Sequence, residues 1–83
     1  RSQQQEAVLD VLSAVVRMRA DQNSLNPIIL ATRKDLEDLL FGGDDCVLLH
    51  GWRFNMVGKE LQGLLNAELS LSLSPEAVVI NPV

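Results

Sequence analysis

The chain has 83 residues, of which 47% are hydrophobic, and its formal net charge at pH 7 is −4. A chain of this length forms one domain at most and buries only about 60–65% of its unfolded surface, so the core is small. The acidic balance argues against strong nonspecific nucleic-acid binding, because that affinity comes mainly from lysine and arginine on phosphates. Any such binding therefore needs a local basic patch.

The single cysteine, Cys46, cannot form an internal disulfide or a thiolate metal cluster, and this fits a reducing compartment. No apolar run approaches the roughly 20 residues of a membrane-spanning helix, and no signal-peptide pattern opens the chain. We therefore expect a cytoplasmic protein with no membrane contact. Because the chain begins at Arg1 without a methionine, we expect a fragment or a processed piece.

Residues 3–22 show the apolar spacing of an amphipathic helix. Arg17 falls opposite the apolar stripe, in water, whereas Arg19 falls close to its centre. The stem of Arg19 should cover apolar surface while its guanidinium finds water or a carboxylate. The residues that define the stripe are Val8, Val11, Leu12, Val15 and Val16.

Two start signals follow. Asn26 precedes Pro27, which predicts a cap and the first position of a short helix. Thr32 and Asp35 form a pattern like a capping box, with a short acid in place of the usual glutamate or glutamine. The helix that begins there should bury Leu36, Leu39 and Leu40 and end at the glycine pair Gly42 and Gly43.

The next stretch predicts a joint between helices. Asp44 or Asp45 should cap a short helix that carries residues 47–49 inward, and Gly51 should break it. From about Arg53 to Asn66 the apolar period is helical again. Trp52 would point away from that stripe if it were helical, so we expect it at the joint, packed between helices. Gly58 lies beside the stripe, where it would permit close approach of a neighbouring helix.

The tail changes character, because leucine and serine alternate from Leu69 to Ser74 with the period of a strand. A turn signal at Ser74–Glu76 and the β-branched run Val78–Ile80 complete a hairpin. The predicted fold class is therefore all-α, a compact bundle of four or five short helices in residues 1–66. A β-hairpin in residues 67–83 packs on the bundle or on a neighbouring domain, since an isolated hairpin is marginal in water.

The sequence carries no catalytic set. His50 and Cys46 supply only two potential zinc ligands, and no third group is positioned to activate a nucleophile. Three of the acids clustered between Asp35 and Asp45 fall where helices start, where carboxylates are favourable. We therefore predict that this chain is not itself an enzyme and holds no metal or cofactor.

Arg33 and Lys34 stand at the first two positions of a helix, where the macrodipole disfavours cations. A local rule broken without evident gain can mark function. The alternative is that Asp35 and the cap compensate and that both cations are simply solvated. Arg53 follows the tryptophan and Lys59 lies on the outer face of the last helix, and these four cations are the candidate phosphate contacts.

Three blocks in order resemble the C-terminal region of bacterial ribonuclease D, the helicase-and-RNase-D C-terminal (HRDC) domain. They are Ala31–Glu37 (ATRKDLE), Gly51–Arg53 (GWR) and Val57–Leu61 (VGKEL). The resemblance spans roughly Val8 to Leu73 and includes the structural positions Thr32, Asp35, Gly42, Gly51, Trp52 and Gly58. Family members often have further charged residues after the second block. This chain has the uncharged residues Phe54–Met56 there, which reduces the number of basic side chains on the surface.

This resemblance implies a helical accessory module that binds nucleic acid. The parent would be a metal-dependent 3′-to-5′ exoribonuclease that trims tRNA precursors, with its divalent metal and catalytic carboxylates in a separate domain. RNA is then the expected partner, bound weakly, together with other domains of the parent. The alternative is a docking module that positions or oligomerises the parent enzyme without binding RNA.

Overall fold

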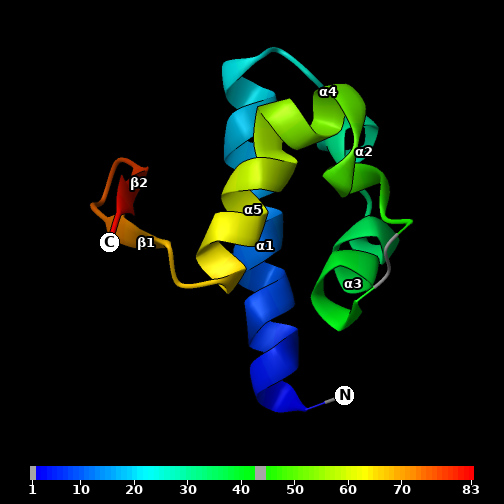
Figure 1. Ribbon diagram of the computed structural model, residues 1–83. Coiled ribbons are helices and arrows are strands. Elements are labelled where there is room, and N and C mark those ends of the chain that lie inside the picture. Colours follow the sequence, from blue (N-terminus) through cyan, green and yellow to red (C-terminus); the bar gives the residue numbers. More distant parts are fainter. Residues whose placement is uncertain (1, 43–44) are drawn as a thin grey trace.

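The computed structural model describes residues 2–42 and 45–83, and it confirms the predicted class, a helical bundle followed by a two-stranded hairpin (Figure 1). A 3₁₀ turn, η1, and a π-helical segment, η2, interrupt the α-helices. In chain order the elements are α1 (Gln3–Gln22), α2 (Pro27–Leu30), α3 (Arg33–Phe41), η1 (Val47–Leu49), α4 (Gly51–Arg53), η2 (Phe54–Gly58), α5 (Lys59–Leu65), β1 (Leu69–Leu73) and β2 (Val78–Pro82).

The predicted helix starts are present with their hydrogen bonds. Asn26 Oδ1 accepts from the backbone N of Ile28 at 3.0 Å at the start of α2. Thr32 Oγ1 accepts from Asp35 N at 3.2 Å, and Asp35 Oδ2 accepts from Thr32 N at 2.9 Å, so the capping box of α3 is complete. These side chains satisfy backbone N–H groups that have no partner inside the first turn of a helix.

The break after α3 is confirmed at Gly42, which takes a left-handed conformation with φ of 92°. Gly43, the second residue of the predicted break, and Asp44, a predicted cap of the next turn, lie outside the described residues. Capping of the next turn by Asp45 is wrong, because Cys46 holds the N-cap position of η1 and makes no side-chain capping hydrogen bond. The chain therefore starts η1 with a buried thiol rather than a carboxylate.

The core lies between α1, α3 and the helical stretch from η1 to α5. Val11 and Val47, both expected inside, are exposed at 43% and 44%. Val11 lies beside the hairpin, which leaves a groove over that side of α1 instead of covering it. The buried apolar side chains are Leu9, Leu12, Val15, Val16, Ala20, Leu30, Ala31, Leu36, Cys46, Leu48, Val57 and Leu61.

Close approach at Gly58 is confirmed. A Cβ at this position would lie 1.8 Å from the carbonyl oxygen of Leu48, so only a glycine lets η2 lie against the backbone of η1. The backbone at Arg53, Phe54, Gly58 and Lys59 is right-handed helical, so α4, η2 and α5 form one continuous helix. Its π-helical segment shifts the phase of the side chains in the middle of that helix.

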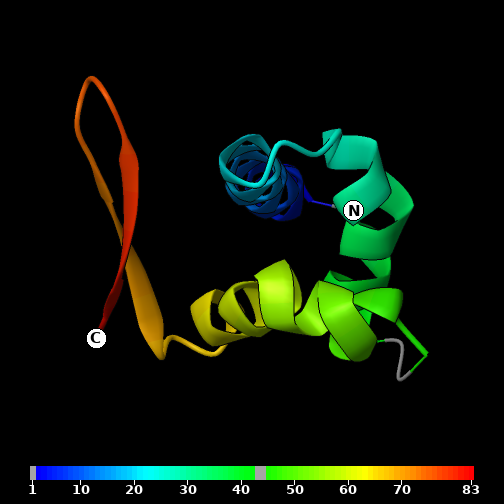
Figure 2. The same cartoon turned by 90° about the horizontal axis from the view of Figure 1, so that it is seen from above.

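The hairpin pairs β1 with β2 in antiparallel register, with Leu71 opposite Ile80. These two side chains are partly buried against the core, and Leu69 packs over Gly63 of α5. In both views the hairpin lies on the opposite side of the molecule from α3 (Figures 1 and 2). The apolar side chains of the hairpin therefore attach the tail to the bundle, while the division of the chain at residue 66 stays a prediction.

Candidate nucleic-acid interface

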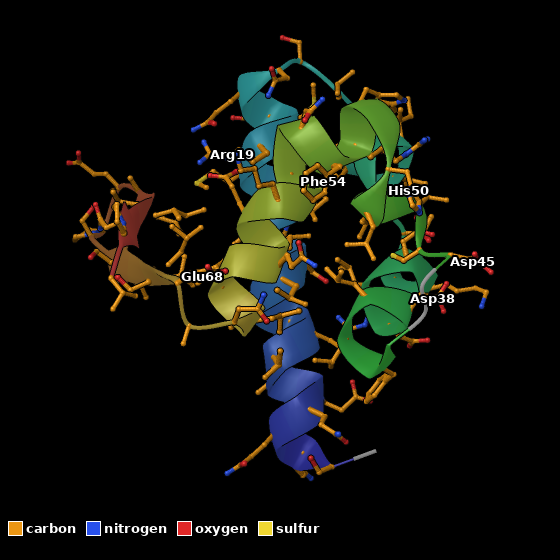
Figure 3. The ribbon with its side chains drawn as sticks, viewed as in Figure 1. Arg19, Asp38, Asp45, His50, Phe54 and Glu68 are labelled. Carbon is orange, nitrogen blue, oxygen red and sulfur yellow. The ribbon has the colours of Figure 1, made fainter. Side chains whose placement is uncertain are left out.

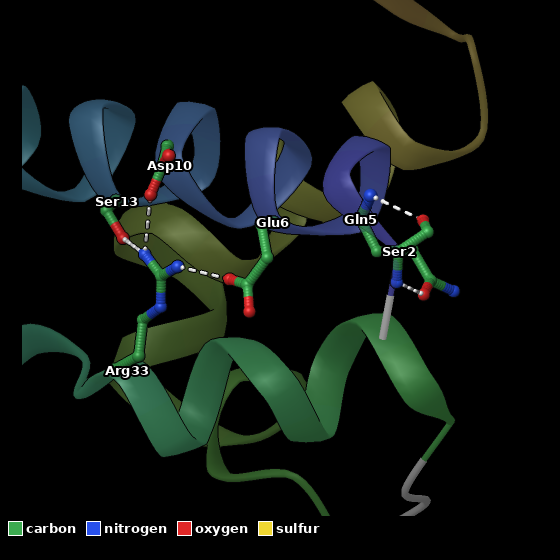
Figure 4. A network of polar contacts seen from close by, with 6 residues as sticks. All are labelled: Ser2, Gln5, Glu6, Asp10, Ser13 and Arg33. Carbon is green, nitrogen blue, oxygen red and sulfur yellow. Dashed lines mark hydrogen bonds and ion pairs between the residues drawn. The ribbon is translucent and has the colours of Figure 1, made fainter.

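Arg33 is held by the first helix. Its Nη2 lies 3.1 Å from Glu6 Oε2, and its Nη1 lies 3.1 Å from Asp10 Oδ1 and 3.2 Å from Ser13 Oγ (Figure 4). The hydrogen bond to Asp10 raises the pKa of Arg33, desolvation opposes it, and Glu6 adds to the rise. Three groups of α1 therefore offset the unfavourable position of this cation at the start of α3, and it is not simply solvated.

Lys34 differs from its neighbour. Its side chain is 82% exposed, and its Nζ lies 3.8 Å from Asp38 Oδ1 one turn further along α3. Such an exposed pair at i and i+4 holds the ammonium only weakly, with an expected contribution of about 0.3–0.5 kcal/mol. The Lys34 ammonium thus remains accessible to an external anion.

Trp52 is 45% exposed, so its predicted packing between helices is wrong. Gly51, with φ of 64°, turns the chain and opens α4, which makes Trp52 helical. A helical residue at this position points away from the buried stripe of α5. His50 lies before this helix without a side-chain capping hydrogen bond (labelled in Figure 3).

Arg53 lies over the indole of Trp52, with Cζ 4.4 Å from the ring centroid. Its Nη2 donates to the carbonyl oxygen of Ile29 at 3.2 Å, which ties α4 to α2. A cation over an aromatic face is attracted by the ring quadrupole. The guanidinium is therefore positioned by two uncharged groups at the joint between α2 and α4.

Lys59 lies apart from the other three candidate cations. It is exposed and lines a groove of about 510 Å³ between α5 and the hairpin, together with Glu60, Glu68 and Ile80. Arg33 and Lys34 share the start of α3, and Arg53 reaches α2. Since Lys59 faces the hairpin instead, the structure does not join all four cations in one compact patch.

A second arginine near Arg33 was not predicted from the sequence. Arg17 lines a hollow of about 360 Å³ between α1, α2 and α3, together with Arg33, Thr32 and Ile28. The sequence offered one indication: Arg17 follows Ser13 by four residues, which places both side chains on one face of α1. Only the packing of α3 against that face reveals the proximity.

Within the described part of the chain, no group of three or more histidine, cysteine, aspartate or glutamate side chains is arranged to hold a metal ion. No helix in residues 2–42 and 45–83 is long and apolar enough to cross a membrane. Cys46 is a free, buried thiol.

The chain is similar to curated ribonucleases D. It is 30% identical to that of Bartonella henselae over 73 residues, which is 82% of this chain and 17% of the relative. It is 30% identical to that of Jannaschia sp. over 80 residues, which is 96% of this chain and 21% of the relative. No family model and no solved structure matches the chain.

These similarities and the helical bundle agree with the class of protein that the sequence resembles. The chain is similar to a segment of ribonuclease D, consistent with a C-terminal domain of that enzyme, and spans about a fifth of the length of the relatives it matches. The predicted resemblance to ribonuclease D is thereby confirmed.

Proposed function

We propose that this chain is an HRDC-type accessory domain that binds nucleic acid at the C-terminus of a ribonuclease D-like 3′-to-5′ exoribonuclease. Its substrate class would be RNA, including tRNA precursors. The metal-dependent chemistry would belong to the remaining four fifths of the parent protein. The similarity to ribonuclease D supports the placement in such an enzyme.

The observation that best supports a role in nucleic-acid binding is the environment of Arg53. Its two contacts among residues 2–42 and 45–83, a main-chain carbonyl oxygen and an indole ring, are both uncharged. Arg19 by contrast is paired with Glu60, and Arg33 is paired with two carboxylates. The charge of Arg53 is not neutralised by these contacts, so a phosphate can bind it without displacing a carboxylate.

The remaining candidate cations would contribute less. Lys34 and Lys59 are exposed and can each meet a phosphate as a point charge. Arg33 would have to exchange Glu6 or Asp10 for the phosphate. With so few contacts on an acidic chain, binding should be weak and should decline as salt rises.

The test is titration of the chain with a labelled tRNA precursor at low salt. Arg53→Gln should weaken binding severalfold. The matched control is Gln4→Glu, which changes the net charge by the same amount at an exposed site in the first turn of α1. If the two variants bind equally well, Arg53 does not contact the nucleic acid.

Protein docking is the second candidate. A groove of about 490 Å³ runs between α1, α5 and β1, and its lining is almost wholly apolar. Grooves of this character often receive an apolar side chain of another domain. The lining residues are Ala7, Val8, Val11, Leu12, Leu64, Leu65, Leu69, Ser70 and Leu71.

Cleavage of the full-length parent just before Arg1 would test this second role. If the two pieces remain together on a sizing column and Val11→Asp separates them, the groove is a docking surface. Free separation of the unsubstituted pieces would exclude stable docking.

A further inference from the structure

An exposed apolar surface lies where α2 meets α4. Ile29 of α2 is 53% exposed and Trp52 of α4 is 45% exposed, so each keeps about half of its surface outside the core. Figure 1 shows α4 in front of α2. The guanidinium of Arg53 joins the two elements, since it contacts both the Ile29 carbonyl oxygen and the Trp52 ring.

Folding does not explain the position of Trp52. Its ring is large and apolar, and burying it would stabilise the fold more than any other single side chain of this small chain. The left-handed turn at Gly51 instead directs it outward on the first turn of the helix. Arg53 then lies over the ring, and 45% of the Trp52 surface remains exposed to solvent.

We propose that this surface binds an unpaired nucleotide of single-stranded RNA. The base would stack on the open part of the Trp52 indole, with Ile29 beside it and its phosphate at Arg53. An aromatic ring with an adjacent arginine is the arrangement that proteins use to hold single strands, and it tolerates any base. A base inside a duplex is already stacked and paired, so a duplex cannot occupy this site.

This inference rests on the proposed function and narrows it from nucleic acid in general to unpaired RNA. The charge at Arg53 favours a nucleotide over an apolar peptide, because desolvating an arginine against an apolar partner would be unfavourable. Stacking on an aromatic ring corresponds to roughly a 5- to 150-fold change in affinity on truncation of the ring.

Trp52 is the only tryptophan among the 83 residues, so its fluorescence reports on this site alone. We would titrate the chain at low salt with a fluorescein-labelled 12-nucleotide oligouridylate and follow anisotropy, and follow tryptophan emission with the same unlabelled RNA. We expect quenching that saturates with the anisotropy signal. A blunt RNA duplex of equal length should bind more weakly and leave the emission unchanged.

Variants of Trp52 test whether the RNA binds at this ring. Trp52→Ala should lower the affinity for the single strand by roughly 5- to 150-fold, whereas Trp52→Phe should retain most of it. Phe41→Ala, at the far end of α3 and also half exposed, is the control and should bind like the parent.

Two different failures can be told apart. If the RNA binds by anisotropy while the emission of Trp52 stays constant, nucleic-acid binding stands and stacking at this site is overturned. If no RNA binds even at low salt, both the inference and the proposed function are overturned.

Discussion

Arg33 and Glu6 are 27 positions apart in the sequence, and their side chains meet with 3.1 Å between Nη2 and Oε2. With Asp10 and Ser13 this pair fastens the start of α3 to α1 (Figure 4). The cation that looks misplaced within its own helix is thus compensated by another helix.

The double variant Glu6→Gln/Asp10→Asn should melt at a lower temperature than the parent at low salt, because Arg33 loses both ionic partners. The difference should shrink in about 1 M salt, where the Debye length is roughly 3 Å. Thermal unfolding at both salt concentrations measures it. Lys34→Ala, at an exposed single pair, is the control, and an equal loss in that variant would contradict a special role for the Arg33 contacts.

Arg19, which is labelled in Figure 3, forms the more sheltered pair with Glu60, with side chains only 26% and 27% exposed and Nε 2.6 Å from Oε1. The hydrogen bond to Glu60 raises the pKa of Arg19 against desolvation. A double-mutant cycle with Arg19→Met and Glu60→Gln should give a coupling of about 1 kcal/mol in the free energy of unfolding. A coupling near zero would mean that the pair does not hold α1 to α5.

Gly58→Ala should destabilise the fold by about 3 kcal/mol or more, because its methyl group would meet backbone atoms of Leu48 that cannot move aside. Gly63→Ala is the matched comparison. Its methyl would lie 2.7 Å from Leu69 Cδ1, a side-chain atom, and the helix gains about 1 kcal/mol of intrinsic propensity. Urea unfolding of both variants should show a clearly larger loss for Gly58, and equal losses would be inconsistent with the close contact.

Burial raises the pKa of the Cys46 thiol above its ordinary value of 9.0, and nearby Asp38 and Asp35 add to the rise. As the pH increases past 9.0, the unfolded chain loses this proton before the folded chain does. The stability that the neutral thiol contributes is complete below that pH and is lost as the pH rises through the raised folded value. In urea unfolding between about pH 7 and 10, the free energy should therefore fall more steeply for the parent than for Cys46→Ala. Parallel curves would show that the thiol is not linked to folding.

The sequence predicted the structural features that depend on residues only a few positions apart. The Thr32–Asp35 capping box, the Asn26 cap and the left-handed Gly42 each satisfy backbone groups within four positions, so their residue types reveal them. The alternating tail likewise predicted the hairpin. Local hydrogen bonds and periodicity can be predicted because they do not require knowledge of the tertiary packing.

Contacts between distant segments could not be predicted in this way. The partners of Arg33 depend on how α3 packs on α1, and no local pattern selects them. Trp52 was misplaced because the helix begins at Gly51 rather than at Arg53, which makes the residue helical and turns it outward. At a helix start an error of two residues therefore changes which side chains are available for binding.

The salt dependence of RNA binding is the most direct measurement of the binding role. For a single-stranded RNA oligonucleotide, we expect the logarithm of the association constant to fall with the logarithm of salt with a slope of about −2, from up to three phosphate contacts (Arg33, Lys34 and Arg53) at roughly −0.7 each. Arg53→Gln should reduce the slope by about 0.7, and Gln4→Glu should leave it unchanged. Absence of binding at low salt, or a slope that Arg53→Gln does not alter, would contradict the assignment of Arg53 as a phosphate contact.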